Sequence, residues 1–190
     1  MTDASFSPFQ THLDQDRALK ILRAALDGAE DGELFIERSR GEALVFDDGR
    51  LRNASYDAEQ GFGLRAVRGE VTGYAHSTEI NEAALKKAAE TVRLAVGDGG
   101  GTLALPPAGQ ITPLYAAIDP AAGVSFAGRV ALLREIDAFA RDLDPRVVQV
   151  SASISTSVQE IAILRPEGGL ATDFRPMARI NISVIVESNS

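Results

Sequence analysis

The chain has 190 residues, no cysteine, and 27 acidic against 19 basic residues, which gives a formal net charge of −8. The lack of cysteine excludes thiolate nucleophiles, disulfide frameworks and cysteine-ligated zinc, and the negative charge disfavours direct nucleic-acid binding. The N-terminus shows no secretory pattern, and no apolar run approaches the ~20 residues that span a bilayer. We therefore expect a cytoplasmic protein with no nucleic-acid or membrane partner.

The first part of the chain predicts an arm, one helix and a group of strands. Residues 1–13 form the predicted loose N-terminal arm. Asp14 or Asp16 is then expected to cap a helix whose apolar residues recur at helical spacing. Residues 33–77 consist of short apolar runs separated by turn residues. This strand group predicts an antiparallel meander of about five strands.

Two helices separated by an irregular segment follow. The first is predicted over 81–96 with Asn81 as its cap, and the second over 126–143 with Ser125 as its cap. In both segments, apolar residues recur every three or four positions. The second helix is expected to bury one stripe of side chains, namely Leu132, Ile136, Phe139 and Leu143. The segment between the helices, 97–124, is rich in glycine and proline and is predicted to be an irregular crossing.

The last strand group, 146–187, shows the most regular pattern in the chain. Apolar and polar residues alternate near both of its ends, which is typical of strands with one buried face. With the first strand group, it predicts an α+β fold: a curved antiparallel sheet of about nine strands with about three helices packed on one face. Residues 14–190 are expected to form a single domain.

The glycine-rich stretch from 60 to 80 allows two interpretations. A phosphate loop needs its glycines at the junction between a strand and a helix. Here Gly61 and Gly63 lie within an apolar run, and Gly69 lies in a turn well before the next helix. The pattern therefore favours a hairpin, in which Gly61 and Gly63 permit the close approach of another segment.

Two groups of residues have side chains suited to catalysis, but their spacing does not favour a catalytic site. The histidines, His12 and His76, are far apart, and neither has the partners that a zinc site needs. The serines at 151, 153, 155 and 157 share one strand face, but no base is identifiable near them. No residue is therefore assigned a catalytic or metal-binding role, and no cofactor is expected in this chain.

The most suggestive constellation is Asp173, Arg175 and Arg179, which surround Pro176 at a predicted strand end. A structural ion pair that holds this corner, or contributes to an interface, is favoured over a clamp for a substrate carboxylate. Both interpretations use the same charged side chains, so the sequence leaves the choice between them open.

Four segments resemble the N-terminal part of the TldD/PmbA family of zinc-dependent peptidases. They are GELFIERSR at 32–40, QGFGLRAVRGEVTGYAHSTEI at 60–80, PLYAAIDP at 113–120 and DFRPMARINISVIVE at 173–187. Their order and spacing match the family over nearly the whole chain. The GxGxRA hairpin and the DxRP segment look more similar to the TldD branch than to the PmbA (TldE) branch.

The resemblance implies the non-catalytic N-terminal domain of a cytoplasmic zinc metallopeptidase that degrades or processes unfolded peptides. The family is also labelled modulator of DNA gyrase. Its zinc site is a His-Glu-x-x-x-His helix in the C-terminal half, and this sequence contains no such motif. We therefore expect this chain alone to be inactive, with zinc and the catalytic C-terminal domain supplied by a longer protein. A natural short relative without catalysis is the less favoured interpretation.

The resemblance also implies partners for this domain. It is expected to frame the substrate channel and the subunit interface, and to meet a peptide substrate and either a PmbA/TldE-like subunit or further copies of itself. The alternative function is a stand-alone peptide-binding or adaptor module without peptidase activity. An independent hydrolase that uses the serine row is the least favoured hypothesis.

Overall fold

The computed structural model describes residues 6–97, 101–104 and 114–188. Its contacts divide the chain into two compact units. Unit 1 comprises Met1–Arg38, Glu59–Leu114 and Glu160–Asp173, whereas unit 2 comprises Ser39–Ala58, Tyr115–Gln159 and Phe174–Ser190. Each unit has its own cluster of buried apolar side chains.

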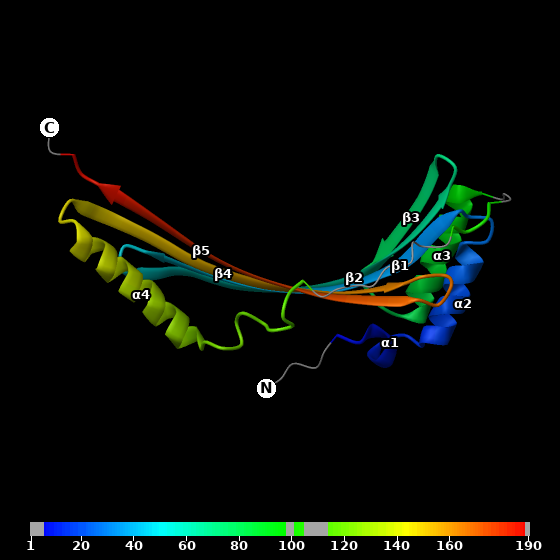
Figure 1. The fold of residues 1–190 in the computed structure, drawn as a ribbon, viewed down its shortest axis with the longest axis horizontal. Helices are drawn as coiled ribbons and strands as arrows, with labels where there is room; N and C mark the ends of the chain where they lie inside the picture. The colour runs from blue at the N-terminus through cyan, green and yellow to red at the C-terminus, as the bar shows by residue number, and fades with distance from the viewer. Residues whose placement is uncertain (1–5, 98–100, 105–113, 189–190) are drawn as a thin grey trace. The chain divides into compact units, whose positions relative to one another are not determined.

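The strands of the described residues form one open antiparallel sheet (Figure 1). They are β1 (Asp31–Asp47), β2 (Arg50–Arg68), β3 (Val71–Ser77), β4 (Val147–Leu164) and β5 (Leu170–Val186), in the spatial order β3-β2-β1-β4-β5. The predicted α+β class with an antiparallel sheet is confirmed. The predicted number of about nine strands is wrong, because the long strands continue through glycines and polar residues that look like turns in the sequence.

The described ranges contain four helices, one more than the sequence predicts. They are α1 (Pro8–Thr11), α2 (Gln15–Ala25), α3 (Glu82–Val96) and α4 (Phe126–Leu143). The additional helix, α1, is a single turn that is too short to show a helical period. None of the described helices has the length and apolar character needed to cross a membrane.

The three longer helices begin at caps that the sequence predicts. The side chains of Asp14, Asn81 and Ser125 each accept a hydrogen bond from the backbone N–H three residues on, at 2.8, 2.8 and 3.1 Å. Each bond satisfies a helix N–H that has no partner within the helix. Asp14 is therefore the cap of α2, which settles the choice between Asp14 and Asp16.

The core of unit 1 lies between its helices and its strands. α3 packs on β3, and α2 packs against α3. Side chains from all three layers are fully buried, among them Leu22 of α2, Leu85 of α3, Leu34 of β1 and Leu64 of β2. Burial of one such side chain stabilises a fold by about 1.5–3 kcal/mol. The two helices thus give unit 1 an extensive apolar core.

Unit 2 has a smaller core under a single helix. Its buried cluster consists of Leu44 and Phe46 from β1, Val130 and Leu133 from α4, and Ala152 and Ile154 from β4. β1 and β4 are neighbours in the sheet. α4 therefore covers these two central strands of unit 2.

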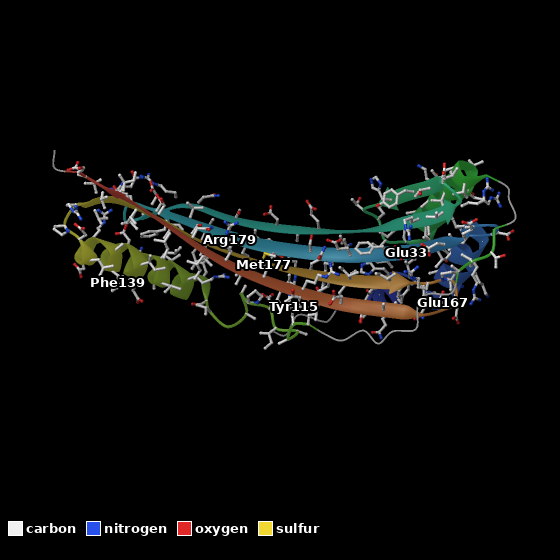
Figure 2. The ribbon with its side chains drawn as sticks, turned by 45° about the horizontal axis from the view of Figure 1, so that its top comes forward. Glu33, Tyr115, Phe139, Glu167, Met177 and Arg179 are labelled. Carbon is white, nitrogen blue, oxygen red and sulfur yellow. The ribbon has the colours of Figure 1, made fainter. Side chains whose placement is uncertain are left out.

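The predicted buried face of α4 is wrong for three of its four residues, since Leu132, Phe139 and Leu143 are 40%, 65% and 68% exposed. The fourth, Ile136, is partly buried and packs against the core of unit 2. Figure 2 shows Phe139 on the outer side of the helix. α4 carries apolar residues on two sides, and periodicity alone does not tell which side meets the sheet. The side that includes Leu133 does so.

The predicted crossing at 97–124 lies partly outside the described residues, since 98–100 and 105–113 are not described. Its described part, 101–104 and 114–124, contains neither helix nor strand. The predicted boundaries of the arm and of a single domain over 14–190 stay predictions.

Candidate functional site

The glycine-rich stretch forms the β2–β3 hairpin. In the register of these strands, Arg68 pairs with Val71 across the turn, and Gly69 in that turn has a φ of +55°. A Cβ added to Gly61 would lie 2.7 Å from the Ser77 carbonyl oxygen. The glycines therefore allow tight packing within a hairpin. The next helix begins only after β3, so the stretch lacks the strand-to-helix junction of a phosphate loop.

The predicted corner at Pro176 does not exist. β5 runs without a break from Leu170 to Val186, so Pro176 and its charged neighbours lie on one extended strand. The reason is that proline is tolerated on an edge strand, and β5 is last in the sheet order. Arg179 donates its Nε–H to Asn181 Oδ1 at 3.0 Å. Asp173 falls in unit 1, and Arg175 and Arg179 fall in unit 2. An ion-pair or interface role for them stays a prediction.

The residues present do not fit a zinc ion. No three His, Cys, Asp or Glu side chains form a metal-binding group within the described ranges. The His12 Nδ1 lies 2.6 Å from the Thr11 hydroxyl, and the His76 ring stacks on Tyr74 at a centroid distance of 5.8 Å. Each histidine thus has a local structural partner.

In unit 1, a buried carboxylate is fully engaged in structural contacts. Glu160 is 7% exposed, and its Oε2 accepts hydrogen bonds from Arg38 Nε and Nη2 at 2.9 and 2.7 Å. Its Oε1 accepts the Phe6 N–H at 3.1 Å, while the Arg38 guanidinium lies 5.2 Å from the Phe6 ring centroid. A carboxylate with both oxygens satisfied in this way ties the N-terminal segment to β1 and β4.

A second charged group of unit 1 joins β1 to its two neighbours. Asp31 lies 2.6 Å from Arg65 Nη2 and 3.1 Å from Arg165 Nη1. Partial burial raises the pKa of Asp31, but the hydrogen bond from Arg65 and the charges of both arginines outweigh it and hold the pKa below its ordinary value. The carboxylate is therefore a poor general base at neutral pH.

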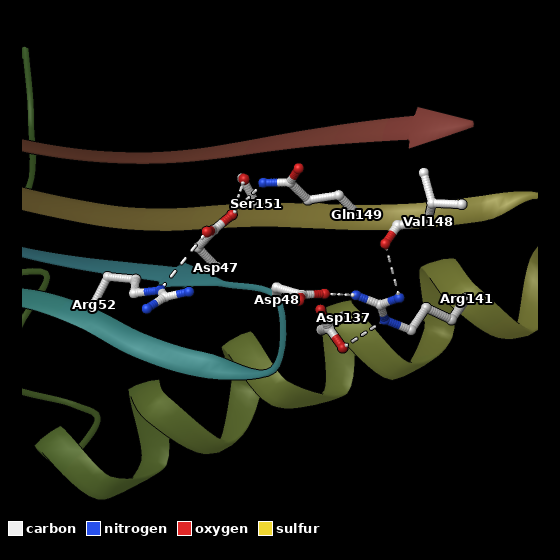
Figure 3. Close-up of polar contacts among 8 residues, drawn as sticks. All are labelled: Asp47, Asp48, Arg52, Asp137, Arg141, Val148, Gln149 and Ser151. Carbon is white, nitrogen blue, oxygen red and sulfur yellow. Dashed lines mark hydrogen bonds and ion pairs between the residues drawn. The ribbon is translucent and has the colours of Figure 1, made fainter. Parts of the chain in front are cut away.

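In unit 2, one serine of the predicted row meets an aspartate (Figure 3). Ser151 Oγ donates to Asp47 Oδ1 at 2.5 Å, and Gln149 Nε2 donates to the same oxygen at 3.0 Å. The hydrogen bond from Ser151, followed by that from Gln149, lowers the pKa of Asp47. A carboxylate with a lowered pKa is a weak base for activating a hydroxyl. The pair links β1 to β4.

The other polar group in Figure 3 fixes α4. Arg141 donates from Nη2 to Asp48 Oδ1 at 2.5 Å, from Nε to Asp137 Oδ2 at 3.2 Å, and from Nη1 to the Val148 carbonyl oxygen at 3.4 Å. The hydrogen bond from Arg141 to Asp137 is the main cause that raises the pKa of Arg141. The arginine thus connects α4 to the β1–β2 turn and to β4. Asp137 and Arg141 stand four residues apart on α4. Asp48 lies 93 residues from Arg141, so no local pattern links it to the helix.

Two hollows among the described residues are small. One in unit 2, lined by residues that include Arg40, Tyr56 and Asp119, measures about 230 Å³. One in unit 1, lined by Ile21 and Ala89 among others, measures about 270 Å³. Both fall below the ~300–1,000 Å³ of typical small-molecule sites, so neither is assigned a ligand.

Sequence comparisons point to a single family. Residues 32–96 match the family model for PmbA/TldA metallopeptidase domain 1, and residues 119–190 match the PmbA/TldA metallopeptidase central domain. A metalloprotease TldD homolog from Haemophilus influenzae is 39% identical over 160 residues, which are 83% of this chain and 33% of that protein. A TldD homolog from Buchnera aphidicola (subspecies Acyrthosiphon pisum) is 29% identical over 177 residues, 93% of this chain and 37% of that protein.

Solved structures share the fold. A candidate modulator of DNA gyrase from Bacteroides thetaiotaomicron has a TM-score of 0.68 at 16% identity, covering 93% of this chain and 42% of that one. TldE from Thermococcus kodakarensis has a TM-score of 0.53 at 12% identity, covering 90% of this chain and 43% of that one. At such identities the likeness concerns the fold alone.

These findings define a domain of metallopeptidase type, built from an antiparallel sheet and flanking helices. The chain belongs to the TldD/PmbA family and corresponds to its N-terminal region, as the resemblance in the sequence predicts. It spans about a third of the length of the TldD homologues that it matches.

Proposed function

We propose that this chain is the non-catalytic N-terminal region of a TldD-like zinc metallopeptidase that processes unfolded peptides. The main support is the 39% identity to a TldD homolog over 83% of this chain. The matched residues make up only 33% of that protein. The sequence holds only His12 and His76, so it cannot supply the paired histidines of the family's zinc motif. On this proposal, zinc and catalysis belong to another part of the whole cytoplasmic protein.

The role proposed for this region is to frame the substrate channel and the subunit interface. A TldE-like subunit is the proposed partner, with a homo-oligomer as the other arrangement. The shared fold of TldE from Thermococcus kodakarensis supports a pairing of two similarly built subunits. Isologous or near-isologous interfaces form readily between such chains, because similar surfaces meet each other.

Strand addition is the proposed way in which this region receives an unfolded peptide. β3 and β5 stand at the two ends of the described sheet order, so each has one edge without a neighbouring strand. Backbone N–H and C=O groups at such an edge bind an extended peptide whatever its side chains. This tolerance suits a peptidase that accepts varied unfolded sequences.

Hydrogen exchange of the purified chain, with and without an unfolded peptide, tests strand addition. We expect added peptide to protect backbone amides of an edge strand. The matched control is a peptide of the same sequence whose alternate backbone nitrogens are methylated, which removes donors but keeps the side chains. Absence of protection at both edges, or equal protection by the methylated peptide, would contradict the proposal.

A further inference from the structure

The described residues contain three Asp-Gly pairs in three different surroundings. They are Asp27-Gly28 and Asp31-Gly32 in unit 1, and Asp48-Gly49 in unit 2. A fourth pair, at 98–99, lies outside the described residues. The nitrogen that follows such an aspartate can attack its side-chain carboxyl group and close a succinimide ring, because glycine has no side chain to shield that nitrogen. Since the three pairs share this chemistry, their surroundings decide which of them reacts.

Asp31-Gly32 is held in place by its neighbours. Two arginines bind the Asp31 carboxylate, Arg65 at 2.6 Å and Arg165 at 3.1 Å, and Gly32 is buried in β1. Partial burial raises the pKa of Asp31, but the hydrogen bond from Arg65 and the charges of both arginines outweigh burial and lower it. Ring closure expels water and therefore needs the protonated acid. At neutral pH the Asp31 carboxylate is thus fixed in place and is rarely in the reactive form.

Asp48-Gly49 is held less completely. The Asp48 carboxylate accepts a hydrogen bond from Arg141 at 2.5 Å (Figure 3), and the Asp48 N–H donates to the Val150 carbonyl oxygen at 2.9 Å. Asp48 and Gly49 have φ of +48° and +74°, as the tight turn between β1 and β2 requires. Rotation of the carboxyl group toward the Gly49 nitrogen would break the bond to Arg141. The Asp48 side chain is 56% exposed, however, so water competes for this bond.

Asp27-Gly28 lacks these restraints. The pair follows Leu26, the C-cap of α2, and Asp27 is exposed. Among the residues that the structure describes, neither the Asp27 carboxylate nor the Gly28 N–H has a hydrogen-bond or ion-pair partner. Gly28 has a φ of +77°, in a region that glycine enters without steric cost. Both reacting groups are therefore free to approach each other.

We propose that Asp27 is a site of spontaneous isoaspartate formation. The Gly28 nitrogen attacks the Asp27 Cγ, a C–N bond forms, and the carboxyl C–O bond breaks. The hydroxyl group leaves as water with the amide proton. A second water molecule then opens the ring: attack at Cγ restores aspartate, and attack at the main-chain carbonyl carbon yields isoaspartate. Water is the only co-reactant, and no group is oxidised or reduced.

Isoaspartate at this position alters the connection between α2 and β1. It routes the backbone through the side-chain carboxyl group and so adds a methylene between residues 27 and 28. The flanking residues Leu26 and Ala29 are each 1% exposed, and the Ala29 N–H donates to the Leu26 carbonyl oxygen at 3.0 Å. The Gly28 carbonyl oxygen accepts the Gly101 N–H at 3.0 Å. A longer backbone between two buried residues should disrupt the turn that these bonds close.

This modification goes beyond the proposed peptidase role and does not rest on it. The reacting atoms belong to two adjacent residues, and the contacts that distinguish the three pairs lie within this chain. The presence or absence of zinc, of a partner subunit or of bound peptide in the whole protein leaves the expected result for this chain unchanged.

Incubation in water enriched in heavy oxygen measures the reaction at the three pairs in one sample. Each opening of a succinimide ring places one heavy oxygen atom in the resulting carboxyl group, which mass spectrometry of the digested 190-residue chain locates. Chromatography separates the isoaspartyl peptide from its aspartyl isomer. In the folded chain at neutral pH, we expect Asp27 to gain label severalfold faster than Asp48, and Asp31 to gain least. In urea, where the contacts are lost, the three rates should converge. Equal labelling in the folded chain, or fastest labelling at Asp48 or Asp31, would overturn the proposal.

Variants test the cause of the difference. Asp27→Glu keeps the charge but needs a larger ring, so it should abolish labelling at this position. Arg141→Gln releases the Asp48 carboxylate and should raise labelling at Asp48 severalfold, while labelling at Asp27 stays the same. Arg65→Gln makes the matched test at Asp31, and circular dichroism shows which variants are folded. Labelling of Asp27→Glu at an undiminished rate, or no increase at the released aspartate of a folded variant, would contradict the proposal.

Discussion

Units 1 and 2 use apolar residues in different ways. Unit 1 covers its strands with two helices and buries leucines from every layer. Unit 2 has one helix, α4, and leaves apolar side chains exposed on the outer side of that helix and along β5. Apolar side chains therefore mostly fill a core in unit 1, whereas in unit 2 many of them remain at the surface around a smaller core. Contiguous exposed apolar surface is a feature of interaction sites.

The largest effect should come from the core of unit 1. Leu85 of α3 is fully buried, whereas Leu94 of the same helix is 81% exposed. Leu85→Ala should lower the free energy of unfolding by about 2–5 kcal/mol, because it removes buried methyl groups and leaves a cavity. Leu94→Ala, the control, should change it by less than about 0.5 kcal/mol. Urea denaturation measures the free energy of unfolding of both variants. Similar decreases in the two would contradict the burial of Leu85 and the exposure of Leu94.

A smaller contrast is expected in α4 of unit 2. Leu133 is fully buried under the helix, and Phe139 on the same helix is 65% exposed. Leu133→Ala should cost about 2–3 kcal/mol, near the lower end of the range, since the small cluster around it can relax. Phe139→Ala should leave stability nearly unchanged. Hydrogen exchange of the α4 amides measures the loss of stability in both variants. A larger loss for Phe139→Ala than for Leu133→Ala would mean that Phe139 is buried rather than exposed.

The buried ion pair of unit 1 should contribute less than its leucine core. Glu160→Gln removes the charge that holds the Arg38 guanidinium and should cost about 2 kcal/mol. Glu82→Gln is the control, because Glu82 forms exposed ion pairs with Arg17 and Lys86. Such surface pairs stabilise little, so thermal unfolding should hardly change. Equal shifts in the two variants would show that burial of Glu160 has no energetic consequence.

The smallest effect should appear in unit 2 at acid pH. The side-chain hydrogen bond from Arg146 is the main cause that lowers the pKa of Asp144 from 3.8 to about 2. A carboxyl group whose pKa is lower in the folded than in the unfolded chain stabilises the fold at pH values above its unfolded pKa. For Asp144, that stabilisation is lost as the pH falls from 3.8 through about 2. The carboxyl resonance of Asp144 should titrate in this range by NMR. Titration near 3.8 would contradict the ion pair.

Local features were predictable from the sequence, because their causes lie within a few residues. The caps Asn81 and Ser125 and the turn at Gly69 need only a side chain and its adjacent backbone. Strand continuity was not predictable, since an edge strand tolerates Pro176 for a reason that depends on its place in the sheet. The buried side of α4 likewise depends on which strands the helix meets.

In the candidate site, the role of the glycines in a hairpin was predictable from their spacing. The contacts that join distant segments were not predictable. Arg38 and Glu160 are 122 residues apart, and no local pattern links them. The packing of α3 on β3 requires a glycine at position 73, because an added Cβ there would lie 2.8 Å from the Val92 carbonyl oxygen, and no turn pattern in the sequence indicates this contact. Such pairs become visible only after the sheet order is known.

The proposal that zinc and catalysis lie outside these residues is tested by measuring zinc content and peptide cleavage of the purified 190-residue chain. We expect no stoichiometric zinc by mass spectrometry of the metal, and no cleavage of an unfolded peptide in the presence of added zinc. One tightly bound zinc ion per chain together with turnover of the peptide would contradict it, because the catalytic site would then reside in these residues.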